Sequence, residues 1–189
     1  KALTERGIGS GKQPSPLPWA RMTDTDLDGQ LSDDRFPLRP NVCVVPFVFF
    51  FMREMECATA EFADLRIDEI IQSISLSMSV SKNDPRAIGC ERRWGCVCTD
   101  GPSPRTCPYH AALELTRYLK DKFGKRVFEA GGPLYPNGFG EPVPAETMLE
   151  VALKIAVLLG QPLLNKAGRN RVGKHTWRAT GAVYMSAIG

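Results

Sequence analysis

Two sets of side chains in this sequence have types and spacings that suit chemistry, and the first set is basic. Arg53 stands three residues before Glu56, and His175 stands three residues before Arg178. Residues three apart share one face of a helix, so His175 and Arg178 would lie together. An imidazole and a guanidinium at a helix start can bind a phosphate or an oxyanion. The simpler alternative is a surface histidine next to an arginine that pairs with a carboxylate.

The second set consists of thiols and one imidazole. Tetrahedral zinc accepts three cysteines and one histidine, so a structural zinc that pins a hairpin to the next helix is one hypothesis. The alternative is a group of free buried thiols, because C-x-C is less typical of zinc sites than C-x-x-C. The candidate ligands are Cys96, Cys98, Cys107 and His110, with Cys90 as a substitute.

Charge is distributed unevenly along the chain. The net charge is +3, but residues 1–81 carry 8 Lys/Arg and 12 Asp/Glu, whereas residues 82–189 carry 16 and 9. A basic half of this kind suits a polyanionic partner such as DNA, although a basic loop can also serve only solubility. The candidate DNA contacts are Lys166, Arg169, Arg171 and Lys174.

The apolar patterns predict a mainly α-helical α+β fold with a small antiparallel β-sheet. With 189 residues, 43% of them apolar, the chain suits one domain. Residues 1–41 are rich in Pro, Gly and Asp, which predicts a linker or the remnant of an upstream segment, so the domain covers residues 42–189. Helices are predicted from Pro46 to about Phe62, over 108–123, over 144–159 and from near Lys174 onward.

The clearest strand is ISLSMSVSK, residues 74–82, in which apolar residues alternate with serines. Lys82 is the last residue of this predicted strand, and the alternation places its side chain on the same face as the apolar residues. A partner strand over 91–98 would place Cys96 and Cys98 on one face with Trp94.

The apolar run VCVVPFVFFFM, residues 42–52, is too short to span a bilayer and contains Pro46, so it predicts a buried helix and no membrane contact. The N-terminus lacks the apolar stretch of a signal peptide. We therefore expect a nuclear or otherwise intracellular protein that is not secreted.

In this order, the motifs resemble the catalytic domain of tyrosine recombinases, the phage-integrase superfamily. That family has an R-x-x-E arginine on an early helix, a lysine on a β-hairpin and an H-x-x-R turn. KHTWRATGAVYMSAIG resembles the H-x-x-R helix, SVSKNDPRAIG the hairpin segment, and TCPYHAALELTRYL the helix after the hairpin. The details are most similar to recombinases of eukaryotic mobile elements, over about residues 42–189.

The resemblance implies DNA cutting and rejoining through a 3′-phosphotyrosine, with no cofactor required for catalysis. Arg53 and Arg178 match the family's phosphate clamp, whose two guanidiniums grip the non-bridging oxygens. Lys82 matches the general acid that protonates the leaving 5′-oxygen, and His175 the residue that positions the phosphate. Glu56 matches an acidic position that orients Arg53.

The family's nucleophilic tyrosine lies well beyond the H-x-x-R turn, whereas this sequence ends 11 residues after Arg178. Tyr184 shares a helix with Arg178 and is predicted to pack, as are Trp177 and Val183. We expect an incomplete fragment of a DNA-recombination enzyme that acts as a homo-oligomer on DNA. The alternatives are a catalytically inactive DNA-binding module and a zinc-stabilised interaction domain.

Overall fold

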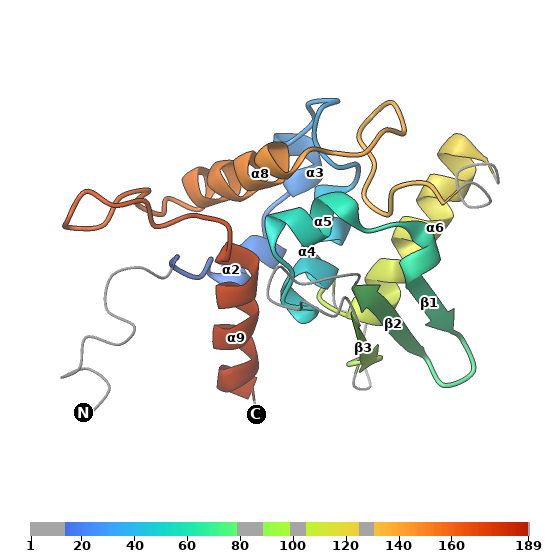
Figure 1. Cartoon of the computed structure of the whole chain (residues 1–189). Helices are drawn as coiled ribbons and strands as arrows, with labels where there is room; N and C mark the ends of the chain where they lie inside the picture. Colours follow the sequence, from blue (N-terminus) through green and yellow to red (C-terminus); the bar gives the residue numbers. More distant parts are fainter. Residues whose placement is uncertain (1–13, 79–88, 99–104, 125–130, 189) are drawn as a thin grey trace.

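A computed structural model describes residues 14–78, 89–98, 105–124 and 131–188. Helices form most of the regular secondary structure, and a small antiparallel sheet lies at one side of them (Figure 1). The predicted mainly helical α+β fold class is therefore confirmed. In chain order the elements are α2 Trp19–Thr23, α3 Leu27–Gln30, α4 Pro40–Phe49, α5 Glu54–Thr59, η1 Phe62–Asp64, β1 Leu65–Asp68, β2 Ser73–Met78, β3 Cys90–Gly95, α6 Pro108–Phe123, α8 Ala145–Leu158 and α9 Thr176–Ile188.

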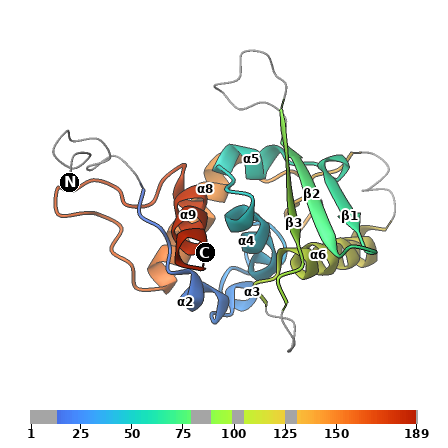
Figure 2. The ribbon, with the colours of Figure 1, turned by 90° about the horizontal axis from the view of Figure 1, so that it is seen from below.

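The central element is α4, whose sequence is apolar on every side. Such a helix is stable only when other elements cover its whole circumference. α6 packs on one side of α4 and α9 on the other (Figures 1 and 2). Every residue of α4 from Val42 to Phe49 is buried. Within the described ranges, no helix combines the length and hydropathy needed to cross a membrane.

The sheet has the order β1-β2-β3, with antiparallel pairing throughout. β2 confirms the predicted alternation, since Ile74 and Leu76 are buried on the core face. The predicted end of this strand, residues 79–82, falls outside the described residues. β1 was not predicted because its four residues, LRID, are too few for periodicity to distinguish a strand from a turn.

The two long amphipathic helices agree with their predicted ranges. α6 begins at Pro108, in the position where proline costs no helical hydrogen bond, and ends before Gly124, which has a φ of 72°. α8 buries its stripe of Met148, Ala152 and Ile155 against the core. Periodicity located both helices because each presents one continuous apolar face.

The single helix predicted from Pro46 to about Phe62 is wrong: two helices, α4 and α5, occupy this region. α4 starts at Pro40, which takes the first-turn position that the prediction gave to Pro46. Pro46 lies inside α4, where its ring is buried among apolar neighbours. The chain breaks after α4 and begins α5 at Glu54, directly after Arg53.

The break between α4 and α5 is a Schellman turn. The N–H of Met52 donates to the carbonyl of Phe47 at 2.9 Å, and the N–H of Phe51 to that of Val48 at 3.2 Å. Phe51 has a φ of 52°, a left-handed conformation that glycine usually occupies at this position. Contacts from other elements must therefore hold this turn, and two of them come from arginines.

Residues 14–41, predicted as a linker or upstream remnant, contribute side chains to the core. α2 and α3 lie in this segment, and the side chains of Trp19, Leu27 and Phe36 are buried. The backbone N–H of Leu17 also donates to Thr180 Oγ1 of α9 at 2.9 Å. The Pro, Gly and Asp residues of this segment form turns between apolar anchors, and composition alone does not reveal the anchors.

Candidate functional site

Glu56 joins the two arginines predicted to form a phosphate clamp. Arg178 Nη2 lies 3.3 Å from each carboxylate oxygen of Glu56, and the backbone N–H of Arg53 donates to Glu56 Oε2 at 2.7 Å. The side chains of Arg178 and Glu56 are 32% and 14% exposed, so water screens this ion pair only partly. Glu56 thus binds the backbone of Arg53, the residue that the resemblance implied it orients, and also the guanidinium of Arg178.

Arg53 is the residue that precedes the first turn of α5, and its side chain is half-buried. Its Nε is buried and has no hydrogen-bond partner among the described residues. An unsatisfied buried donor costs about 1–3 kcal/mol. A bound acceptor such as a phosphate oxygen would remove this cost.

Arg178 is fixed by the turn that follows α4. Its Nε donates to the carbonyl of Phe51 at 2.9 Å. α9 approaches this turn closely at Gly181, where an added Cβ would lie 2.2 Å from the carbonyl oxygen of Val48. A larger residue at this position would separate α9 from α4. Gly181 therefore permits the contact that brings Arg178 to Glu56.

His175 lies in the turn that directly precedes α9, close to the predicted helix start near Lys174. Its backbone carbonyl accepts the N–H of Ala179 at 2.8 Å, which starts the helical hydrogen bonding. The side chains of His175 and Lys174 are exposed. They are accessible to a ligand that approaches the N-terminal end of α9.

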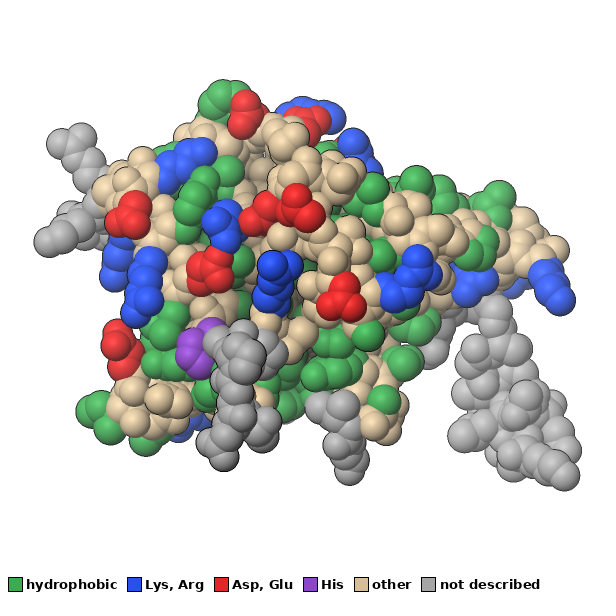
Figure 3. All heavy atoms as spheres, turned by 180° about the vertical axis from the view of Figure 1, so that it is seen from behind, with side chains coloured by type: hydrophobic (Ala, Val, Ile, Leu, Met, Phe, Trp, Pro, Cys, Tyr) green, Lys and Arg blue, Asp and Glu red, His purple; other side chains and the backbone are tan. Residues whose placement is uncertain are grey.

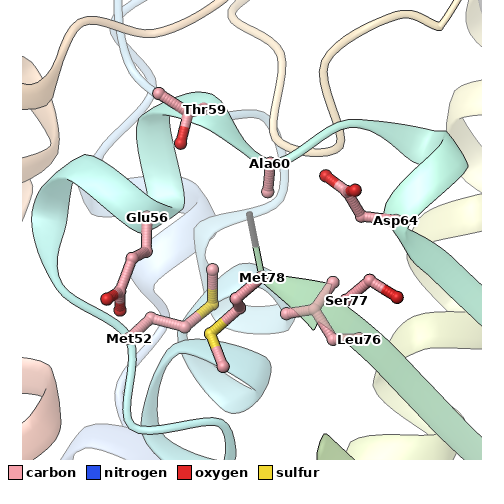
Figure 4. Close-up of a pocket in the computed structure, with 8 residues that line it drawn as sticks. All are labelled: Met52, Glu56, Thr59, Ala60, Asp64, Leu76, Ser77 and Met78. Carbon is pink, nitrogen blue, oxygen red and sulfur yellow. The ribbon is translucent and has the colours of Figure 1, made fainter. Parts of the chain in front are cut away.

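Lys82, the predicted general acid, falls outside the described residues. The described part of β2 ends at Met78, where a small pocket opens beside Glu56 (Figure 4). α5 and β2 supply most of the lining, so the carboxylate of the arginine site and the strand that leads toward Lys82 share this pocket. The lining residues are Met52, Glu56, Thr59, Ala60, Asp64, Leu76, Ser77 and Met78.

The loop of residues 160–175, here called the basic arm, projects from the body between α8 and α9 (Figure 1). It folds back on itself through a bridge between Leu164 and Asn170, and it contains no acidic residue. Figure 3 shows Lys and Arg side chains along this projecting end of the molecule. Lys166, Arg169 and Lys174 are exposed.

Arg171, the fourth predicted DNA contact, is half-buried and has a structural role in the basic arm. Its Nε donates to Ser15 Oγ at 3.1 Å, and its carbonyl accepts the N–H of Ser15 at 2.6 Å. The base of the arm is thus tied to the N-terminal segment, while its tip remains exposed.

The predicted thiol–imidazole set forms a compact cluster. Cys96, Cys98, Cys107 and His110 present ligand atoms that all lie within 4.8 Å of one another. His110 Nδ1 lies 3.3 Å from the Sγ atoms of Cys98 and Cys107 and 3.7 Å from Cys96 Sγ. The Sγ atoms of Cys96 and Cys107 are also 3.7 Å apart.

These distances fit a tetrahedral ion. Sulfur ligands about 2.3 Å from a tetrahedral Zn²⁺ lie about 3.8 Å from one another. Burial opposes ionisation of Cys107, but hydrogen bonds from His110, Val97 and Cys98 outweigh it and lower the pKa of this thiol to about 7. The cluster can therefore bind a metal ion that prefers thiolate and imidazole.

Two details of the cluster differ from the sequence prediction. β3 ends at Gly95, so Cys96 and Cys98 come from the segment after the strand rather than from one strand face. Cys90 is exposed at the other end of β3 and is not part of the cluster. Cys107 and His110 come from the start of α6, so the four ligands connect β3 to this helix.

The aromatic residues of α9 have mainly packing roles. Trp177 is 1% exposed and its ring centroid lies 5.4 Å from that of Phe47. The ring of Tyr184 packs against Trp19 at 5.4 Å and against Phe49 at 5.8 Å, which agrees with the packing role predicted for it. Val183 was also expected to pack, but 53% of it is exposed.

Arg92 on β3 was missed in the sequence. It pairs across the sheet with Leu76, so its side chain lies on the core face. Its Nη1 donates to the carbonyl of Phe50, and its guanidinium lies 5.9 Å from the ring centroid of Phe51. The sequence does contain a hint of this role: Arg92 and Trp94 are two residues apart in the strand, so their side chains share the core face.

The fold is similar to that of a solved recombinase structure. A similar solved structure is the XerH site-specific recombinase bound to palindromic difH substrate, in a post-cleavage complex. The TM-score is 0.56 at 12% sequence identity, and the similarity covers 95% of this chain and 45% of that chain. At this identity it establishes the fold alone. No protein-family model and no curated protein matches the chain.

Proposed function

We propose that this chain binds DNA and grips one phosphodiester with Arg53 and Arg178, as part of a DNA-recombination enzyme of the tyrosine-recombinase type. The observation that carries the proposal is the junction at Glu56, which contacts the backbone N–H of Arg53, just before α5, and the guanidinium of Arg178 on α9, although Glu56 and Arg178 are 122 residues apart. The recombinase-like fold supports the same reading. The exposed basic arm would extend the contact along the DNA backbone.

The proposed chemistry is phosphoryl transfer without a catalytic metal. A tyrosine oxygen attacks phosphorus, a 3′-phosphotyrosine bond forms, and the bond from phosphorus to the 5′-oxygen breaks. Arg53 and Arg178 would stabilise the charge on the non-bridging oxygens, and His175 would help position the phosphate. Lys82 would give its proton to the leaving 5′-oxygen. The tyrosine would come from sequence beyond the present chain.

The test compares DNA binding and covalent attachment. For this chain, Arg178→Ala should weaken binding to a fluorescent DNA duplex by roughly tenfold or more, because a charge-assisted contact is lost. For the protein extended through its downstream sequence, the same substitution should abolish the covalent protein–DNA adduct. An adduct that persists in Arg178→Ala would contradict the clamp assignment.

Two alternatives predict different results. A catalytically inactive DNA-binding module would bind DNA with a steep salt dependence but form no adduct in the extended protein. A zinc-stabilised interaction domain would not bind DNA at all. We also propose, from the resemblance, a eukaryotic mobile-element origin, a nuclear location and assembly as a homo-oligomer on DNA, which size measurements of the protein–DNA complex would test.

For the cysteine cluster we propose a structural zinc. Cys96, Cys98, Cys107 and His110 form a closed Cys₃His set in which protein ligands occupy all four positions, so no position is left for catalysis. The ion would hold the segment after β3 against the start of α6. Metal analysis of the protein as purified, without chelator, should give about one zinc per chain, and a chain that neither carries zinc nor binds added zinc would contradict the assignment.

A further inference from the structure

We propose that Arg92 is a positioning residue through which the metal cluster supports the arginine site. This inference rests on the proposed function, because it concerns how the site that grips phosphate keeps its shape. β3 is the physical link: Arg92 lies near its middle, and Cys96 and Cys98 directly follow its end.

The first step is the contact of Arg92 with the Schellman turn. Its Nη1 holds the carbonyl of Phe50, and its guanidinium covers the ring of Phe51. Arg178 Nε holds the next carbonyl, that of Phe51, at 2.9 Å. Two arginines from different elements thus bind successive carbonyls of one turn.

The second step is the need of this turn for support. The left-handed conformation of Phe51 is unfavourable for a residue with a side chain and persists only where its surroundings impose it. Arg53 follows Phe51 by two residues and directly precedes α5. The direction in which Arg53 leaves the turn therefore depends on the contacts that hold Phe50 and Phe51.

The third step is the attachment of β3 itself. β3 is an edge strand, paired only with β2 among the described strands, and its core face contacts α4 through Trp94, whose ring lies 5.4 Å from that of Phe49. Beyond Gly95 the backbone is held by the bond from Cys96 N–H to the carbonyl of Gln72, at 2.7 Å. An ion on Cys96 and Cys98 would anchor this end of the strand to α6. Loss of the ion would release the strand that carries Arg92.

Arg93 provides a matched control on the same strand. It has the same charge but lies on the opposite face of the sheet, where it donates to Ser73 Oγ at 2.8 Å. Arg92→Ala and Arg93→Ala therefore remove the same charge from neighbouring positions. Arg92→Lys keeps the charge and loses the flat group that covers Phe51.

The experiment measures hydrogen exchange in the zinc-loaded chain without DNA, together with affinity for a fluorescent DNA duplex. Arg92→Ala should speed exchange in residues 47–56 and weaken DNA binding, each by roughly tenfold, because one charge-assisted hydrogen bond is lost. Arg93→Ala should change both by less than about twofold, because its hydrogen bonds go to Ser73 on the opposite face of the sheet and not to the turn after α4. Arg92→Lys should fall between the two.

Removal of zinc from the wild-type chain should speed exchange in residues 47–56 while α8 stays protected. The inference is overturned if Arg92→Ala leaves this segment protected, if zinc removal does so, or if zinc removal exposes α8 equally. Weaker DNA binding with unchanged exchange would also overturn it, since Arg92 would then contact DNA directly. If the wild-type chain does not bind DNA but the exchange results hold, the proposed function fails and the coupling stands.

Discussion

The cysteine cluster and the arginine site are assembled in different ways. The four ligands of the cluster lie close in sequence, and their three thiols and one imidazole converge on one point. The arginine site joins residues from distant helices, and Glu56 already supplies a counter-charge within the protein. The proposed zinc would hold the first site together, whereas the packing of α4 and α9 holds the second. Substitutions that disturb only the metal ligands or only the helix packing therefore test whether the two sites differ in this way.

The largest expected effect is loss of the ion. Cys107→Ser removes a buried ligand and should abolish zinc binding, which lowers the melting temperature by about 10 °C for a site worth about 4 kcal/mol in a chain of this size. Metal analysis and thermal unfolding measure both quantities. The control is Cys90→Ser, which lies outside the cluster and should change neither. If the two substitutions had equal effects, Cys107 would not be a metal ligand in a way that Cys90 is not.

The next effect concerns packing beneath the arginine site. Gly181→Ala places a Cβ against the carbonyl of Val48 and should lower the free energy of unfolding by about 2–3 kcal/mol, since backbone atoms must move apart. Urea denaturation measures this change, and the zinc content should stay the same. Gly95→Ala is the control, because a Cβ there meets no atom within 4 Å. A neutral Gly181→Ala would mean that α9 can shift without cost.

A smaller effect is expected for the counter-charge. Glu56→Gln keeps the shape of the side chain but removes the ion pair with Arg178, so the free energy of unfolding should fall by about 1 kcal/mol. Glu114→Gln is a more exposed control, with 52% of its side chain accessible, and should cost less. Unchanged stability in Glu56→Gln would show that the hydrogen bonds alone hold Arg178.

The smallest effect is expected at the basic arm. Lys166→Gln should weaken DNA binding severalfold and reduce the slope of log affinity against log salt concentration by roughly one, because one phosphate contact is lost. A salt titration of DNA binding measures the slope. Lys122→Gln, at the end of α6 and far from the arm in Figure 1, should leave the slope unchanged. A slope that is the same for both variants would exclude Lys166 from the DNA contact.

The parts of the fold that sequence predicted best are those governed by local patterns. α6 and α8 have long apolar stripes with proline or glycine at their ends, and the alternation in β2 is regular. The metal ligands were also identifiable, because short spacings bring Cys107 and His110 onto one turn of a helix. β1, with only four residues, left no comparable pattern.

The arginine site was harder to predict in its geometry than in its residues. A resemblance pointed to Arg53, Glu56 and Arg178, but no local pattern shows that Glu56 contacts the guanidinium of Arg178. That contact follows from the left-handed Phe51 and the close approach at Gly181. Both depend on the packing of helices that are far apart in sequence.

The bond from Leu17 to Thr180 has a practical consequence for dividing this chain into pieces. Composition suggests starting a shortened version at residue 42, but this cut would remove both the anchor of α9 and the buried Trp19, whose ring packs against Tyr184. Tyr184 would lose one of its two ring contacts, and the base of the basic arm would lose Ser15. Expression boundaries should therefore be drawn before residue 14, and a protease cut between α2 and α4 should loosen the opposite end of the chain.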